Sequence, residues 1–186
     1  MNTFAKVDTE SFLRFASEHP QQRYELERGR IVQQMPGGTR RHHVLARKIA
    51  RSIEDQIDAT GWTVVPEHGV KIGDSVRYPD IVVEPIDEPG TSLATERPVM
   101  IVEVLSPSTT ATDLNTKPAE YLTIAALDAY VVASQDEPAM LVWQRDDAGR
   151  FPETGVEISG AGNMLKLAGR FGAVTLKLGE IYDGIC

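Results

Sequence analysis

The sequence predicts a mixed α/β (α+β) fold in which a mixed β-sheet is flanked by helices. Strand-like runs rich in Val, Ile and aromatic residues fill the centre of the chain. Stretches with apolar residues at helical spacing lie before and between these runs. With 186 residues and 41% hydrophobic content, the chain is long enough to bury a core, and we expect one domain spanning residues 1–186.

The first two elements should be a helix and a β-hairpin. Residues 8–18 place apolar side chains at helical spacing after a capping Asp or Thr, and Pro20 ends this pattern. Residues 23–35 then alternate apolar and polar side chains around Gly29. This alternation predicts two short strands with a turn at the glycine.

A longer amphipathic helix is expected from residue 39 to about residue 59, after the break at Pro36. Its apolar residues recur every four positions, which places them on one face. They are Leu45, Ile49, Ile53 and Ile57.

Strand-like runs in the centre of the chain predict the sheet itself. A further helix should interrupt them, beginning near Asn115 with Pro118 in its first turn. The apolar residues that suit this helix are Tyr121, Leu122, Ile124, Ala125 and Leu127. The tail adds one or two edge strands and a short final helix. The expected central strands cover residues 62–72, 77–85, 98–106, 129–134 and 139–145.

Two carboxylates stand where packing favours an apolar residue. Asp80 follows Pro79 at the start of "IVVEP", and Glu103 interrupts a run that is apolar on both faces, as in a buried central strand. Removing an unpaired carboxylate from water is costly, so each must be protonated, ion-paired or bound to a cation. On neighbouring strands, the two could hold one Mg²⁺, which prefers oxygen ligands. The alternative is a pair of salt-bridged acids at strand ends.

An ordered set of motifs resembles a known family. The motifs are "YEL", "RYPDIVV", "VEVLSPST", then Asp113 with Lys117 and Tyr121, and finally "YVVAS". In order and spacing they are similar to the Uma-two family of bacterial restriction-endonuclease-like proteins, part of the PD-(D/E)xK nuclease superfamily. The resemblance covers about residues 8–182 and implies a restriction-endonuclease-like core, with acidic residues at one end of the central strands.

Carried onto this sequence, the resemblance implies that Asp80 and Glu103 bind Mg²⁺, with Mn²⁺ able to replace it. The superfamily lysine normally lies two residues after the glutamate, where this chain has Leu105. The family lysine lies instead in the following helix, which points to Lys117. Its ammonium would stabilise charge on a phosphate or orient a water. Otherwise Lys117 is a plain solvated helix residue, and Pro118 after it departs from the apolar residue usual in the family.

The resemblance singles out two further candidate catalytic residues. Glu25, in the first hairpin strand, is a candidate third acid, unless it simply faces solvent. His42 stands three residues before Leu45, on the core side of its helix, and matches a histidine often seen in the family. It would assist the water or contact phosphate. The alternative for His42 is a capping or hydrogen-bonded histidine.

A basic stripe is expected on the helix opposite its isoleucines. Arg40, Arg47 and Arg51 are spaced by seven and four residues, and Arg41 and Lys48 widen the stripe. Such a stripe could follow a nucleic-acid backbone beside His42. The alternative is a solvated face of i,i+4 ion pairs.

Composition narrows the function classes. A net charge of -8 disfavours bulk attraction to nucleic acid, so any contact with DNA would depend on a local basic surface. No apolar run approaches the ~20 residues of a membrane span, and the N-terminus has an acidic amphipathic pattern rather than that of a signal peptide. The only cysteine, Cys186, allows no intramolecular disulfide. We therefore expect a cytoplasmic protein with no membrane partner.

Two functions remain open at this point. The first is a Mg²⁺-dependent endonuclease that hydrolyses phosphodiester bonds of DNA. The second is a catalytically inactive nuclease-fold protein that binds nucleic acid or a protein partner, which Leu105 and the acidic net charge favour. An enzyme of this size that cuts both strands of a duplex would act twice or as a homodimer.

Overall fold

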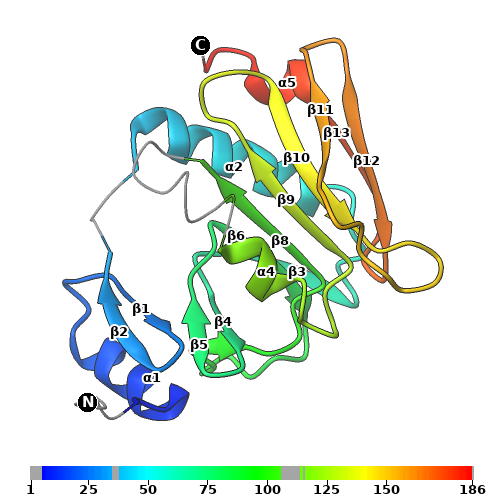
Figure 1. Cartoon of the computed structure of the whole chain (residues 1–186). Helices are drawn as coiled ribbons and strands as arrows, with labels where there is room; N and C mark the ends of the chain where they lie inside the picture. Colours follow the sequence, from blue (N-terminus) through cyan, green and yellow to red (C-terminus); the bar gives the residue numbers. More distant parts are fainter. Residues whose placement is uncertain (1–5, 35–37, 106–113, 115, 186) are drawn as a thin grey trace.

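The computed structural model describes residues 6–34, 38–105, 114 and 116–185 (Figure 1). Met35, Pro36, residues 106–109, Asp113, Asn115 and Cys186, to which expectations were attached above, lie outside the described residues. The described helices are α1 (Thr9–Glu18), α2 (Arg40–Glu54), α4 (Lys117–Tyr121) and α5 (Leu178–Tyr182).

A six-stranded sheet forms the main body of the molecule and confirms the expected mixed sheet. Its strand order is β11-β10-β9-β8-β6-β3, and neighbours are antiparallel except for the parallel pair β8 and β9. The central strands are buried along their length, as continuous apolar runs predict. The strands are β3 (Trp62–Pro66), β6 (Ile81–Pro85), β8 (Met100–Val104), β9 (Ala129–Ala133), β10 (Ala139–Gln144) and β11 (Val156–Ser159).

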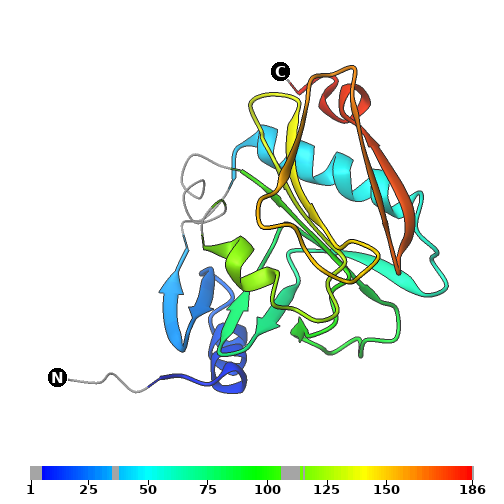
Figure 2. The same cartoon turned by 45° about the vertical axis from the view of Figure 1, so that its right-hand side comes forward.

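Helix α2 packs its apolar face against this main sheet. Leu45, Ile49 and Ile53 are fully buried there, so the expected row of apolar residues is confirmed. The same core includes α5 and the separate hairpin β12 (Met164–Gly169) and β13 (Gly172–Lys177). Figure 2 shows α2 and this hairpin side by side. The helix ends earlier than expected, at Glu54, although the following turn keeps Ile57 in the core.

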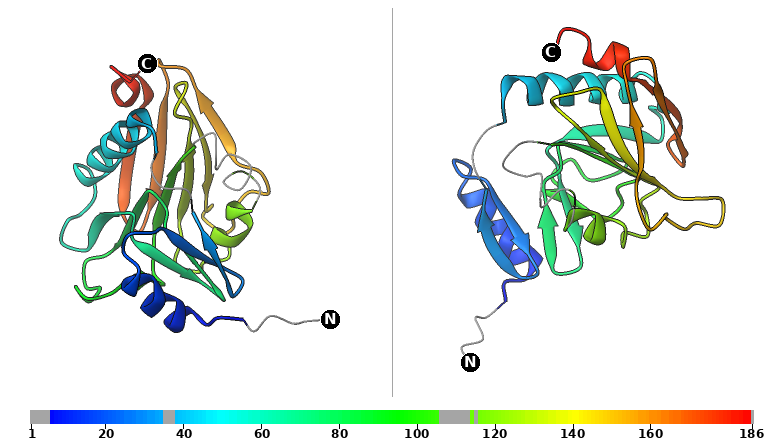
Figure 3. Two further views of the ribbon diagram at one scale, coloured as in Figure 1. Left: turned by 90° about the vertical axis from the view of Figure 1, so that its left-hand side faces the viewer. Right: turned by 45° about the horizontal axis from the view of Figure 1, so that its top comes forward.

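A second, five-stranded sheet contains the predicted hairpin, in the order β2-β1-β5-β4-β7. Arg28 and Gly29 form the hairpin turn with φ angles of 50° and 80°, the left-handed values that a two-residue turn of this kind needs. Helix α1 packs on this sheet through Phe12, at the end of the molecule away from α5 (Figures 1 and 3). The strands are β1 (Tyr24–Glu27), β2 (Arg30–Gln33), β4 (Gly69–Ile72), β5 (Ser75–Arg77) and β7 (Ala94–Thr95).

Two of the expected strands are each divided between the two sheets. The run 62–72 breaks at Glu67, whose φ is 53°, and supplies β3 to the main sheet and β4 to the second. The run 77–85 breaks at residues 78–80, because Pro79 has no N–H to donate to a ladder. Asp80 therefore lies where the chain passes from one sheet to the other.

Helix α4 is shorter than the sequence predicts, since turns follow it from Leu122 onward. Ile124 and Leu127 still pack in the core on this face of the main sheet, which explains the helix-like apolar spacing. Pro118 lies in the first turn of α4, as expected. Among the described residues, no helix is both long and apolar enough to cross a membrane.

Candidate active site

Asp80 is held at the edge of the main sheet by two hydrogen bonds. Its Oδ1 lies 2.9 Å from His42 Nε2, and its Oδ2 accepts from the backbone N–H of Val104 at 2.7 Å. The side chain is 16% exposed. The bond to Val104 fixes the carboxylate across the strand that carries Glu103.

His42 approaches Asp80 from the first turn of α2. The Thr39 side chain caps that turn by accepting from the His42 N–H. The hydrogen bond to Asp80 raises the pKa of His42, against the opposing effect of burial. The ring fits closely over Gly38, since a Cβ there would lie 2.7 Å from His42 Cδ2. The backbone at position 38 thus sets where the imidazole lies.

Glu103 occupies a closed environment on β8. Its Oε1 accepts from Lys117 Nζ at 2.7 Å and from the Tyr121 hydroxyl at 3.0 Å. Lys117 and Tyr121 share one face of α4 because they are four residues apart. The side chains of Glu103 and Lys117 are 5% and 8% exposed. Burial, together with the negative charge of Glu103, raises the pKa of Tyr121 well above its ordinary value, so its hydroxyl stays a donor.

Strand register relates the two acids. In the antiparallel pair β6 and β8, Ile81 is the partner of Val102, so Asp80 and Glu103 stand one step further along the same register. Glu103 lies on the face of the sheet that bears Ile101 and packs against Tyr121 of α4, whereas Asp80 precedes β6 and bonds His42 on α2, which packs on the other face. In the part of the chain that the structure describes, no group of three or more His, Cys, Asp or Glu side chains is placed to hold a metal ion. Mg²⁺ can be held by one or two protein carboxylates, with water and substrate as its other ligands.

Glu25 lies in a different group of charges. Its Oε2 accepts from Arg77 Nη1 at 2.8 Å and from Gln34 at 3.2 Å, and its Oε1 accepts from the N–H of Tyr78 at 3.4 Å. Its side chain is buried rather than facing solvent. Its contacts therefore tie the hairpin to the segment that leads to Asp80.

A groove of about 690 Å³ runs beside Asp80 along α2. Arg47 and Arg51 line it together with His42 and Asp80, so two of the five residues of the predicted basic stripe lie beside the acid. The other polar lining residues include Arg23, His43, Glu54, Asp55 and Glu67.

The remaining basic residues of α2 are engaged elsewhere or lie outside the lining. Arg41 pairs with Asp136 at 3.0 Å. Lys48 Nζ donates to the backbone carbonyls of Glu180 and Asp183. Arg40 is exposed at the start of the helix and does not line the groove. The stripe is therefore divided, and the part beside Asp80 consists of Arg47 and Arg51.

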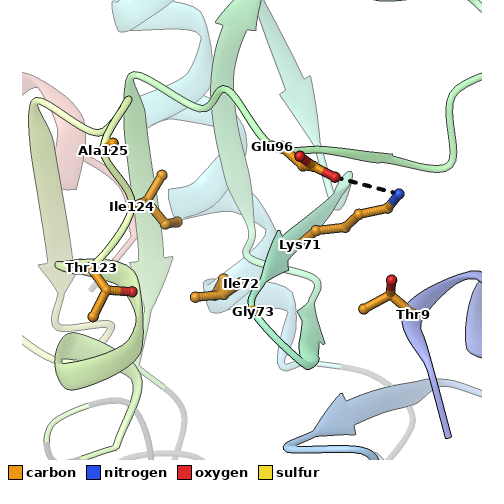
Figure 4. Close-up of a pocket in the computed structure, with 8 residues that line it drawn as sticks. All are labelled: Thr9, Lys71, Ile72, Gly73, Glu96, Thr123, Ile124 and Ala125. Carbon is orange, nitrogen blue, oxygen red and sulfur yellow. Dashed lines mark ion pairs between the residues drawn. The ribbon is translucent and has the colours of Figure 1, made fainter.

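A second pocket, of about 330 Å³, lies away from these acids (Figure 4). Its one lysine, Lys71, pairs with Glu10 at 2.5 Å and Glu96 at 3.7 Å, and the hydrogen bond to Glu10 raises its pKa. Thr123 and Ile124 line the opposite wall. With its cation already neutralised, this pocket is a weaker candidate than the groove.

The residue that sequence reasoning missed is Arg77. It is fully buried and contacts carboxylates of β1 and α4. Burial by itself would lower the pKa of this guanidinium, but hydrogen bonds to Glu120, Glu25 and Glu27 raise it above the ordinary value. The available signal was an arginine inside an apolar strand run, directly before the segment that carries Asp80.

Comparisons with known proteins bear on the family and the fold. The model of the Uma2 family, described as "Putative restriction endonuclease", matches residues 9–176. No curated protein matches the chain. A crystal structure of "a putative nuclease belonging to DUF820" from Anabaena variabilis ATCC 29413 is similar, with a TM-score of 0.70 and 17% identity over 88% of this chain and 91% of that chain. The likeness confirms a nuclease-like fold, and the family match shows that the chain belongs to the Uma2 family.

Proposed function

We propose that the protein is a Mg²⁺-dependent endonuclease that hydrolyses phosphodiester bonds of DNA. One observation carries the proposal: Asp80 and His42 line the same groove as Arg47 and Arg51. Two arginines can follow a phosphate backbone, and a carboxylate in the same groove would be available to a cation beside that phosphate.

The donor set suits the proposed cation. Asp80 and Glu103 offer carboxylate oxygens from neighbouring strands, and Mn²⁺ would be accepted by the same donors. Bound there, Mg²⁺ would lower the pKa of a water and stabilise charge on a phosphodiester oxygen.

The chain's own residues have separate tasks in this proposal. His42, hydrogen-bonded to Asp80 through Nε2, orients the carboxylate and can hold a proton beside the groove. Lys117 places a positive charge against Glu103, and in this proposal that charge offsets the charge that develops on the phosphate. Glu25 would act indirectly, through its ion pair with Arg77. Arg47 and Arg51 would bind the phosphate backbone of DNA, and Arg40 would extend this contact along α2.

A second candidate is a nuclease-fold protein that binds nucleic acid or a protein partner without cutting. The observation that favours it is that both acids already have protein partners. Oε1 of Glu103 accepts from both Lys117 and Tyr121, and both oxygens of Asp80 accept hydrogen bonds. A cation would have to compete with these contacts.

Cleavage of supercoiled plasmid distinguishes the two candidates. We expect the wild type to cut with Mg²⁺ or Mn²⁺ and to stop when EDTA is added. Asp80→Asn should lower the rate by about a thousandfold or more, by analogy with loss of a principal catalytic group. Glu54→Gln is the matched control, because Glu54 lines the same groove but is exposed, and it should keep the wild-type rate.

Each outcome has a defined meaning. Failure of the wild type to cut with either metal, together with DNA binding in fluorescence anisotropy, would favour the second candidate. Equal rates for wild type and Asp80→Asn would contradict the assignment of the site. Direct conversion of plasmid to the linear form, rather than to nicked circles, would support a homodimer that cuts both strands.

A further inference from the structure

Arg77 joins three elements through a single buried side chain. Its Nη1 donates to Glu25 Oε2 at 2.8 Å and to Glu27 Oε1 at 2.6 Å, both on β1. Its Nε donates to Glu120 Oε2 at 2.8 Å on α4. Arg77 itself belongs to β5 and is fully buried. We call these four residues the Arg77 cluster.

The cluster reaches the helix that carries Lys117. Glu120 is three residues after Lys117, so one turn of α4 separates the contact with Arg77 from the contact with Glu103. This helix has only five residues, and its N-cap residue, Thr116, makes no side-chain cap. Helices this short are not stable by themselves, so tertiary contacts must fix the orientation of α4.

Arg77 also begins the segment that carries Asp80. Pro79 and the hydrogen bond from the N–H of Tyr78 to Glu25 restrict the path between the two residues. The Arg77 cluster therefore contacts both parts of the candidate site: the chain leading to Asp80 on one side and α4 on the other.

We infer that Arg77 is a positioning residue, which fixes the Lys117 ammonium against Glu103 through its ion pair with Glu120. The catalytic consequence rests on the proposed function; the placement of Lys117 does not. Arginine suits this task because its planar guanidinium offers five donors in fixed directions, and one lysine ammonium could not reach the same three carboxylates with that geometry.

The test uses two glutamates that share Arg77 but differ in location. Replacing Arg77 itself would leave three carboxylates facing one another and risks unfolding, so the variants are Glu120→Ala and Glu27→Ala. Each removes one carboxylate from the guanidinium, but only Glu120 lies on α4. Glu120 also pairs with the exposed Arg28 at 3.9 Å, so Arg28→Ala, which leaves the contact with Arg77 in place, is measured beside them and should not shift the Lys117 resonance. Glu120→Gln keeps an acceptor for Arg77 and serves as the conservative variant.

Two measurements are made on the full chain. The first is the ¹⁵N resonance of the Lys117 ammonium, assigned by its loss in Lys117→Met. We expect this resonance to shift and broaden in Glu120→Ala, to recover partly in Glu120→Gln and to remain unchanged in Glu27→Ala. The second is plasmid cleavage, in which Glu120→Ala should lower kcat by about tenfold to a hundredfold with KM unchanged, since small misplacement of a catalytic group has effects of this size.

The inference would be overturned if Glu120→Ala and Glu27→Ala changed the Lys117 resonance equally. It would also be overturned if that resonance stayed unchanged in Glu120→Ala. If the wild type cuts no DNA, the proposed endonuclease activity fails, and the resonance alone decides whether Arg77 positions Lys117. Thermal melting of each variant identifies any general loss of structure.

Discussion

Asp80 and Glu103 give the same signal in the sequence, an acid in an apolar strand run, but they occupy opposite environments. The Asp80 side chain lines the groove and is 16% exposed, with a histidine and a backbone amide as partners. The Glu103 side chain is 5% exposed and carries its own cation, Lys117. The buried acid is therefore coupled to stability, while the acid in the groove can exchange partners at lower cost.

Replacing Lys117, the buried partner of Glu103, should reveal the difference between the two acids most strongly. Lys117→Met takes the ammonium from a buried carboxylate and should lower the free energy of unfolding by about 3–5 kcal/mol. Asp80→Asn keeps the shape of its side chain beside the groove and should cost only about 1 kcal/mol. Urea unfolding followed by circular dichroism measures both.

The double variant Lys117→Met, Glu103→Gln is the control for this effect. It removes both charges, so it should recover much of the stability that Lys117→Met loses. Similar losses for Lys117→Met and Asp80→Asn would mean that the two environments do not differ as described.

Displacement of the His42 ring should affect the groove side alone. In Gly38→Ala the new Cβ would lie 2.7 Å from His42 Cδ2, so the ring must move and its bond to Asp80 must change. We expect plasmid cleavage to fall by about tenfold or more, while Lys117 and Glu103 are unaffected. Gly61→Ala is the matched control, because a Cβ there meets nothing within 4 Å. A wild-type rate for Gly38→Ala would remove His42 from the mechanism.

Removal of the groove arginines should have the smallest effect of the three. Arg47→Ala with Arg51→Ala should weaken DNA binding and reduce the slope of log affinity against log salt by about 2, one for each phosphate contact. Lys48→Ala is the control on the same helix, because the Lys48 ammonium donates to the protein's own carbonyls, those of Glu180 and Asp183. Fluorescence anisotropy over a salt series measures the slope, and equal slopes for the two proteins would contradict the assignment of the groove.

Much of the fold was predictable because it depends on local patterns. The period of four along α2, the alternation around Gly29 and the apolar runs of β6, β8 and β9 each correspond to a described element. The division into two sheets was not predictable from these patterns. The run 62–72 has strand-like residues throughout, and only a non-glycine residue with positive φ, Glu67, separates its two strands.

The candidate site shows the same limit. Asp80, Glu103, Lys117 and His42 could be named from motifs, and the structure places them in two adjacent groups. Their different exposure depends on how α2 and α4 pack, which no local pattern encodes. The contacts of Arg77 join residues 43 to 52 positions apart, so sequence spacing gave no indication of them.

The parallel pairing of β8 and β9 has a consequence for the order of folding. Parallel strands need a long crossover connection. Closing that loop costs chain entropy before the strand pairing can stabilise it. Lys117 belongs to this crossover, whereas Glu103 belongs to the strand that precedes it. The two side chains therefore meet only after the crossover has closed onto the sheet. A chain that is still folding, or one that has lost this pairing, carries the residues of the candidate site without assembling them.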